Sequence, residues 1–394
     1  MRLSLGVQVG GLGALSVLLL VGWIHFFLTE HSMMPELQLV GDPKSYSTGP
    51  TYGHFRRSIE IGYQPLMVPA AHTLEVMRRD RVLERYLVRT GTRLVFVPFT
   101  DGRSCVEAFD RGLDGAVISG ISTVRLASCQ PVHIVSRFQT GYAAFVCRGA
   151  RSVADLKGRR MGYTLGEGAL HALMAVLERN GLDLSALELV DLRGGDPLRA
   201  MAGGKIDAFA EWEPIPTAAV RNFPELASVG RGVADVHLVL SRKTAQDQRE
   251  LVLELIAAQI RAFFWLKSSG KNLHRASGWV RQEEQRVLAP EIIIDLFDLN
   301  RLATDYISDV DTFVGIADRA GRTHTRTDEL RDQFEFGRKM GVIPKDIAWE
   351  RLNSLVLHGM TQLVLARSTV YSLRAPDVAS APIVLKEVPD AGRD

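Results

Sequence analysis

The stretch LKGRRMGYTLGEGALHALMAVLERNGL at residues 156–182 decides the fold. It reads as a short strand, a turn built on Gly166 and Gly168, and a helix whose apolar side chains recur every three or four residues. A second strand is expected at 188–192, then a short helix that ends at a pair of glycines, and a third, buried strand at 206–210. Strands that alternate with helices predict an α/β protein with a mostly parallel sheet.

The same order of elements occurs earlier in the chain. Residues 58–63 alternate as a strand does, a helix is expected over 70–88, and a second strand over 93–99. A helix with one apolar face and a third strand complete this unit. Two such units, joined by extended segments at 141–147 and 236–240, predict two lobes with two crossing strands.

The composition excludes several classes of protein. The 394 residues are 46% hydrophobic and 23% charged, which is typical of a globular protein large enough for two cores. The net charge is only +2, with basic and acidic residues interspersed, so no nucleic-acid partner is expected. Three cysteines without paired spacing leave one disulfide possible. Because neither these cysteines nor the ten histidines have ligand spacing, we expect no metal and no cofactor.

The first 29 residues predict a transmembrane helix. The segment from Leu3 to Leu28 contains no Asp, Glu, Lys or Arg and is long enough to cross a bilayer. Arg2 precedes it, which favours an internal N-terminus and an external body. A secretory signal peptide is the alternative, although no cleavage site of small residues follows. We favour an uncleaved anchor.

A set of short motifs in a fixed order resembles a known family. The motifs are Ile61-Gly62-Tyr63-Gln64, Leu156 to Gly162, Leu177 to Leu182, Gly204 to Ala208, Trp212-Glu213-Pro214 and Met340 to Lys345. Over residues 58–360 their order and spacing are similar to those of the solute-binding proteins of nitrate, sulfonate and taurine ABC importers. The same group includes the thiamine-pyrimidine-precursor binding proteins.

The resemblance implies a two-lobed, periplasmic-binding-protein-like fold of type II that closes around a small polar molecule. It also implies a partner, an ABC permease in the inner membrane, and a body in the periplasm that is anchored to that membrane or secreted after signal cleavage. The expected parts are an anchor or signal sequence (1–29), a linker (30–57), lobe 1 with the C-terminal helices (58–145 and 236–375), lobe 2 (146–235) and a disordered tail (376–394).

The candidate ligand contacts lie at strand ends and helix starts, where free N–H groups suit a polar or anionic group. They are Tyr63, Gln64, Gly102, Arg103, Ser104, Ser119, Gly120 and Ser122 in lobe 1, and Thr164, Gly166 and Gly168 in lobe 2. The resemblance supplies the first two of these. Simple alternatives remain open, since Tyr63 and Gln64 can form a packing turn and Ser104 can cap its helix.

Glu211, Trp212 and Glu213 complete the candidate site at the end of the third strand of lobe 2. Tryptophan offers a flat apolar wall and one N–H donor, and an acid favours a ligand that carries an amine or a positive charge. If Glu211 or Glu213 faces the cleft, taurine-like zwitterions or aminopyrimidines fit better than nitrate. In the alternative, both acids are solvated and only Trp212 packs.

An enzyme on the same fold is the competing function. The pair Gly166-x-Gly168 does not complete a dinucleotide fingerprint, because His171 stands where the third glycine belongs. The sequence has no G-x-S-x-G elbow and no obvious catalytic dyad. We therefore expect binding without catalysis, and keep an enzyme, or a ligand-sensing ectodomain that docks on a membrane partner, as alternatives.

Overall fold

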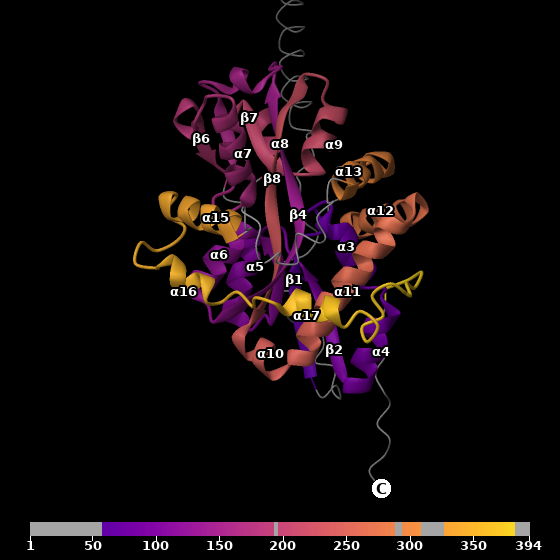
Figure 1. Cartoon of the computed structure of the whole chain (residues 1–394). Coiled ribbons are helices and arrows are strands. Elements are labelled where there is room, and N and C mark those ends of the chain that lie inside the picture. The colour runs from indigo at the N-terminus through magenta and orange to yellow at the C-terminus, as the bar shows by residue number, and fades with distance from the viewer. Residues whose placement is uncertain (1–56, 193–195, 288–293, 309–326, 383–394) are drawn as a thin grey trace, which may run out of the picture.

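The structure is a computed structural model that describes residues 57–192, 196–287, 294–308 and 327–382 (Figure 1). Within these residues, eight strands form one mixed sheet in the order β2-β1-β3-β8-β4-β7-β5-β6. The strands are β1 (Arg57–Tyr63), β2 (Thr92–Pro98), β3 (Gly115–Ser119), β4 (Val132–Arg148), β5 (Arg160–Tyr163), β6 (Glu188–Asp191), β7 (Ala208–Trp212) and β8 (Leu226–Ser241).

Helices cover the sheet along its whole length (Figure 1). They are α3 (Ala70–Met77), α4 (Arg81–Thr90), α5 (Gly102–Ala108), α6 (Gly120–Cys129), α7 (Gly168–Arg179), α8 (Pro197–Ala202), α9 (Ile215–Asn222), α10 (Arg242–Asp247), α11 (Arg249–Ser268), α12 (Gly270–Val287), α13 (Leu296–Ser308), α15 (Thr327–Lys339), α16 (Trp349–Asn353) and α17 (Met360–Ala366). We call the part built on β1, β2 and β3 the first half, and the part built on β5, β6 and β7 the second half.

The two long strands β4 and β8 join the halves. They contain 17 and 16 residues and pair with each other in antiparallel fashion along their whole length. The predicted crossing segments, 141–147 and 236–240, lie within them. The predicted parallel pairing is present, but the sheet is mixed, because both long strands also run antiparallel to their other neighbours, β7 and β3. The parallel pairs lie within each half, where helices make the crossovers.

The helix expected over 70–88 is two helices. Asp80 separates them, because its carboxylate accepts the backbone N–H groups of Val82 (2.8 Å) and Leu83 (3.3 Å) and so caps the start of α4. The sequence pattern over 70–88 does not show this break, because buried apolar residues continue from α3 into α4.

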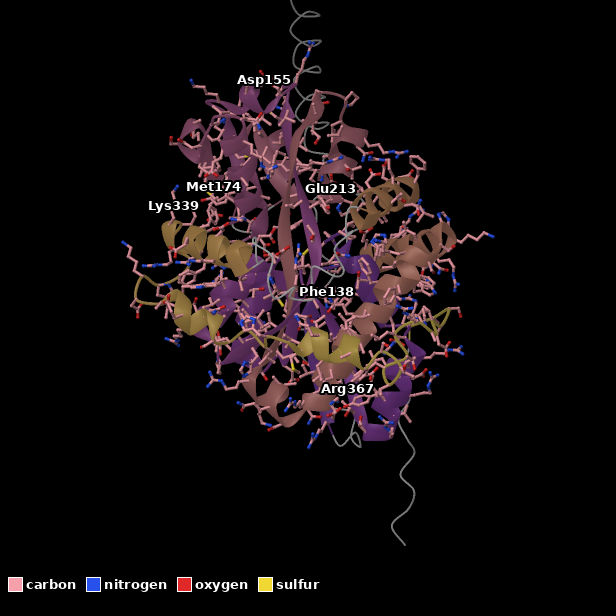
Figure 2. The ribbon with its side chains drawn as sticks, viewed as in Figure 1. Phe138, Asp155, Met174, Glu213, Lys339 and Arg367 are labelled. Carbon is pink, nitrogen blue, oxygen red and sulfur yellow. The ribbon has the colours of Figure 1, made fainter. Side chains whose placement is uncertain are left out.

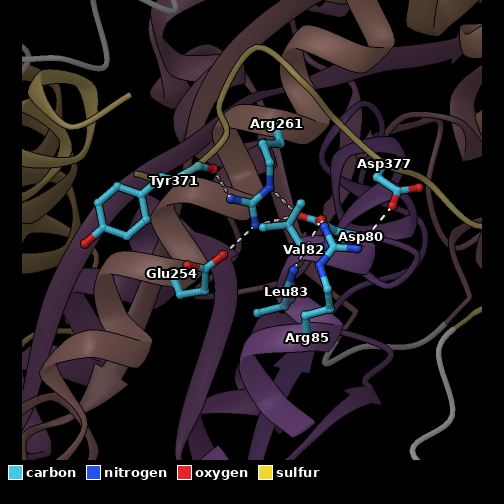
Figure 3. Close-up of polar contacts among 8 residues, drawn as sticks. All are labelled: Asp80, Val82, Leu83, Arg85, Glu254, Arg261, Tyr371 and Asp377. Atoms are coloured by element: carbon cyan, nitrogen blue, oxygen red, sulfur yellow. Dashed lines mark hydrogen bonds and ion pairs between the residues drawn. The ribbon is translucent and has the colours of Figure 1, made fainter. Parts of the chain in front are cut away.

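A buried ion network fastens α11 to α4 and to the C-terminal segment (Figure 3). The guanidinium of Arg261 is 1% exposed. It binds Asp80 (2.7 Å), Glu254 (2.6 Å) and the backbone carbonyl of Tyr371 (2.7 Å). Nearby, Val378 forms a bridge with Asp80. The predicted disordered tail therefore begins too early at 376, and residues 383–394 lie outside the described part.

Two other predictions concern the N-terminus and the cysteines. The predicted anchor at 1–29 lies outside the described residues, as does the linker at 30–57 except for Arg57, which begins β1. In the described ranges, no helix is both long enough and apolar enough to span a bilayer. The three cysteines are free, so the disulfide that the sequence left possible is not formed.

Candidate functional site

Several predicted residues meet where the strand ends of the two halves face each other. We call them, with one residue that the sequence analysis missed, the junction cluster: Gly102, Ser119, Ser122, Gly166, Glu167, Gly168 and Trp212. The hydroxyl of Ser122 in α6 donates to the carbonyl of Gly166 at 3.2 Å, and the hydroxyl of Ser119 donates to that of Ser122 at 3.1 Å. These bonds connect the start of α6 to the turn before α7, and thus one half to the other.

Glycines allow this close approach of the two halves. A Cβ atom on Gly102 would lie 2.2 Å from Oγ of Ser122, and one on Gly168 would lie 2.8 Å from the ring of Trp212. Both distances are too short for real atoms, so larger residues would push the elements apart. Gly166 has a φ of +89°, a backbone conformation that favours glycine, and it shapes the turn.

Glu167 is the residue that the sequence analysis missed. It lies just before α7 and is 5% exposed. Its carboxylate accepts the backbone N–H of Gly102, at the start of α5, and the indole N–H of Trp212 at 3.3 Å. Burial, followed by the nearby Asp101 and Glu211 carboxylates, raises the pKa of Glu167 to about 8. A carboxyl group therefore lies buried between donors from both halves.

The two acids beside Trp212 are not both solvated, so that alternative is wrong. Glu213 is fully buried; its carboxylate accepts the backbone N–H of Thr217 in α9 at 3.1 Å and lies 3.4 Å from the guanidinium of Arg231. Burial raises its pKa. Glu211 is half-buried, and burial together with Asp101 raises its pKa to about 7. Of the two predicted acids, Glu211 is thus the one whose charge raises the pKa of Glu167.

Two predicted residues at the start of α5 make their side-chain contacts within that helix or with its N-cap residue, Asp101. The backbone N–H of Ser104 donates to Asp101 at 2.7 Å and its hydroxyl donates to the same carboxylate at 2.9 Å. Arg103 is half exposed and pairs with Glu107 one turn further along α5. These contacts match the capping alternative for Ser104, and a ligand role for either residue stays a prediction.

Tyr63 is the last residue of β1, and Gln64 follows it. The Tyr63 side chain is buried, and its hydroxyl donates to Glu283 of α12 at 2.5 Å. Tyr63 is thus bonded to α12, one of the helices that cover the sheet. Gln64 is 7% exposed, and its side-chain oxygen has no hydrogen-bond partner in the described ranges. Gln64 therefore has an unused acceptor, whereas the Tyr63 hydroxyl already has a partner.

Gly120 and Thr164 border the junction cluster. A Cβ atom on Gly120 would lie 1.4 Å from the side-chain oxygen of Gln333, so this glycine faces α15. The carbonyl of Thr164 accepts the backbone N–H of Glu167 at 3.2 Å and so helps to form the turn. Their roles in ligand binding stay predictions.

One surface hollow lies elsewhere, near the end of the second half where Figure 2 labels Asp155. It has a volume of about 550 Å³ and is lined by Gly149, Arg151, Ala154, Asp155, Lys157, Gly158 and Arg159. None of these residues belongs to the junction cluster. In the part of the chain that the structure describes, no group of His, Cys, Asp and Glu side chains is arranged to hold a metal ion.

Comparison with known proteins relates this fold to one group. The family model described as "NMT1/THI5 like" matches residues 122–269. A candidate aliphatic sulfonates-binding protein of Escherichia coli K12 is 31% identical over 70 residues. That match covers 18% of this chain and 22% of the relative, so the chain spans about a fifth of the curated relative that it matches.

Solved structures extend the similarity to the whole fold. The alkanesulfonate-binding protein SsuA of Xanthomonas axonopodis pv. citri, bound to MOPS, has a TM-score of 0.56 at 18% identity; the match covers 77% of this chain and 98% of SsuA. A DSZB variant in complex with biphenyl-2-sulfinic acid has a TM-score of 0.53 at 13% identity, and the match covers 79% of this chain and 99% of DSZB. At these identities the likeness shows the fold alone. The resemblance predicted from the sequence is confirmed: this chain matches the NMT1/THI5-like family model and has the periplasmic-binding-protein-like α/β fold of the sulfonate-binding proteins.

Proposed function

We propose that this protein is an extracytoplasmic solute-binding protein that captures a small polar molecule between its two halves and delivers it to the permease of an ABC importer. The proposed ligand belongs to the sulfonate, taurine, nitrate or aminopyrimidine class. The observation that carries the proposal is the junction cluster, where a carboxylate already lies between an N–H donor of the first half and one of the second. Polar groups from both halves thus converge at one buried place, where a small polar ligand can bond to both halves at once.

The connection between the halves supports capture by closure. Halves that are joined by the paired strands β4 and β8 can move as hinged bodies if the contacts between them adjust, among them those of the junction cluster and the hydrogen bond from the backbone N–H of Val68 to the carbonyl of Glu213. The division into lobe 1 (58–145 and 236–375) and lobe 2 (146–235) belongs to this proposal. The candidate sulfonates-binding relative and the sulfonate-binding structures support the ligand class.

The location and the partner are part of the same proposal. Sulfonate-binding structures with this fold include proteins described as periplasmic, which supports a periplasmic body. The apolar segment within residues 1–29 would then anchor the protein in the inner membrane, close to the permease.

A panel of ligands tests the function. Full-length protein in mild detergent is heated with alkanesulfonates, taurine, nitrate, bicarbonate, aminopyrimidines or amino acids. A ligand that binds only the native state raises the melting temperature by an amount that grows with its concentration. We expect a selective rise with one chemical class. A melting temperature that no compound changes would contradict capture of these solutes.

Catalysis is the second candidate, because DSZB, which is described as a desulfurization enzyme, shares the fold. The junction cluster gives this candidate little support. Its two hydroxyls, on Ser119 and Ser122, bond to each other and to a carbonyl. The nearby Cys105 is buried, and burial raises the pKa of its thiol, which makes it less reactive. Release of sulfite from an arenesulfinate by the purified protein would favour the enzyme.

A further inference from the structure

Glu167 occupies an unusual place for a residue at the start of a helix. It is the residue immediately before α7, yet its side chain makes no capping bond to that helix. Its carboxylate instead reaches the backbone N–H of Gly102 in the other half and the indole N–H of Trp212. The chain's own carboxylate thus takes one N–H donor from each half.

A ligand that has an anionic group but no cationic group is disfavoured here for two reasons. It must displace Glu167 from Gly102 and Trp212, and it must then lie near the Asp101 and Glu211 carboxylates, which already raise the pKa of Glu167. Like charges at such a buried position disfavour one another strongly. A simple anion such as nitrate or an alkanesulfonate is therefore a poor match for the junction cluster.

A cationic amine meets complementary chemistry at the same place. The carboxyl group of Glu167, whose pKa is about 8, is mostly protonated at neutral pH in the ligand-free protein, and an ammonium group beside it lowers that pKa and favours the ionised form. An ionised carboxylate accepts about four hydrogen bonds, and Glu167 receives two. An ammonium group would supply further donors and the opposite charge. A cation for an anionic group is also nearby, since Nη1 of Arg125 in α6 would lie 3.5 Å from a Cβ atom on Gly166, the residue before Glu167.

We propose that Glu167 determines ligand specificity, selecting a small zwitterion whose amine pairs with its carboxylate over an anion that lacks an amine. The inference rests on the proposed function and names its ligand class more narrowly, as an aminosulfonate or a comparable amine-bearing acid. Arg125 is the group placed to receive the anionic end.

Matched ligand pairs test this inference by calorimetric titration of the full-length protein. The pairs are taurine with ethanesulfonate, and 3-aminopropanesulfonate with propanesulfonate. We expect the wild type to bind the amine-bearing member of at least one pair at least tenfold more tightly. Glu167→Gln keeps the size of the side chain and removes its charge, so it should weaken that ligand at least tenfold and strengthen its amine-free analogue. Glu178→Gln, an exposed acid on the same helix, should change neither affinity.

The outcomes separate this inference from the function on which it rests. Equal binding of both members of each pair by the wild type would overturn the role of Glu167 while leaving solute capture intact. The same conclusion would follow if Glu167→Gln folded normally and kept the wild-type preference. Binding of no compound by any of the proteins would overturn both. The wild-type comparison alone decides the matter if the variant does not fold.

Discussion

At the scale of single residues, the structure brings together seven positions, one of which, Glu167, supplies a buried carboxyl group. Six of them could be predicted, because strand ends and helix starts meet at one edge of each half of an α/β sheet. Glu167 was missed since an acid in a glycine turn is ordinarily solvated. Strand alternation predicts the packing of Tyr63, because Ile59, Ile61 and Tyr63 share a face that is buried under the helices.

Glu167 should make the stability of the protein depend on pH. Its pKa of about 8 in the folded protein lies above the ordinary value of 4.5, because burial, Asp101 and Glu211 disfavour its charge. The folded state therefore holds the proton more tightly, and the free energy of unfolding falls as the pH rises from about 4.5 to about 8. The loss should be on the order of 2 kcal/mol or more.

Urea unfolding at pH 5 and pH 9 measures this effect. The wild type should lose more stability between the two values than Glu167→Gln, which has no charge to bury. The comparison with the variant is needed because Glu211 titrates in the same range. An equal loss in both proteins would show that Glu167 is not the group responsible.

Trp212 should contribute directly to the affinity for the ligand. Its side chain is buried between Gly141 and Gly168, and its N–H binds Glu167. Trp212→Ala should weaken binding of the best ligand by more than about 1 kcal/mol, as expected for a buried aromatic anchor. Calorimetric titration measures the change, and cooperative unfolding checks the fold. Trp349→Ala, in α16, should leave affinity unchanged; equal weakening by both variants would argue against a local role.

At the scale of elements, the sequence predicted the existence of the strands better than their length. The segments 141–147 and 236–240 are apolar stretches within β4 and β8. The apolar pattern of β4 is interrupted at Arg137, Gln139 and Thr140, where the strand passes between the halves. Arg137 nevertheless pairs there with Asp235 of β8, so tertiary contacts, which a local pattern does not contain, extend both strands.

The Arg261 network should stabilise the packing of α11 on α4 (Figure 3). Arg261→Ala would leave the buried carboxylates of Asp80 and Glu254 without their cation and should cost about 3–5 kcal/mol of unfolding free energy. Arg85 forms a matched control, because its side chain is 64% exposed and its pair with Asp377 spans 3.2 Å. Arg85→Ala should cost about 1 kcal/mol or less. Chemical denaturation compares the two, and similar losses would contradict the difference in burial.

At the scale of the whole molecule, two halves share the paired strands β4 and β8 and meet at the junction cluster. The two-lobed α/β class followed from the repeated order of strands and helices. The mixed sheet did not, since strand direction depends on which distant segments pair. The surface hollow near Asp155 offers a different location for a ligand, with no contact between halves.

Amide hydrogen exchange of the full-length protein, with and without saturating taurine, tests the central claim most directly. Ligand captured between the halves should slow exchange at 102–122, 164–168 and 211–217, which come from both halves, because binding reduces opening of these segments. We expect this protection in the wild type, and we expect Glu167→Gln to lose it. Protection confined to residues 149–159, or no change in exchange at all, would contradict capture of an amine-bearing sulfonate at the junction cluster.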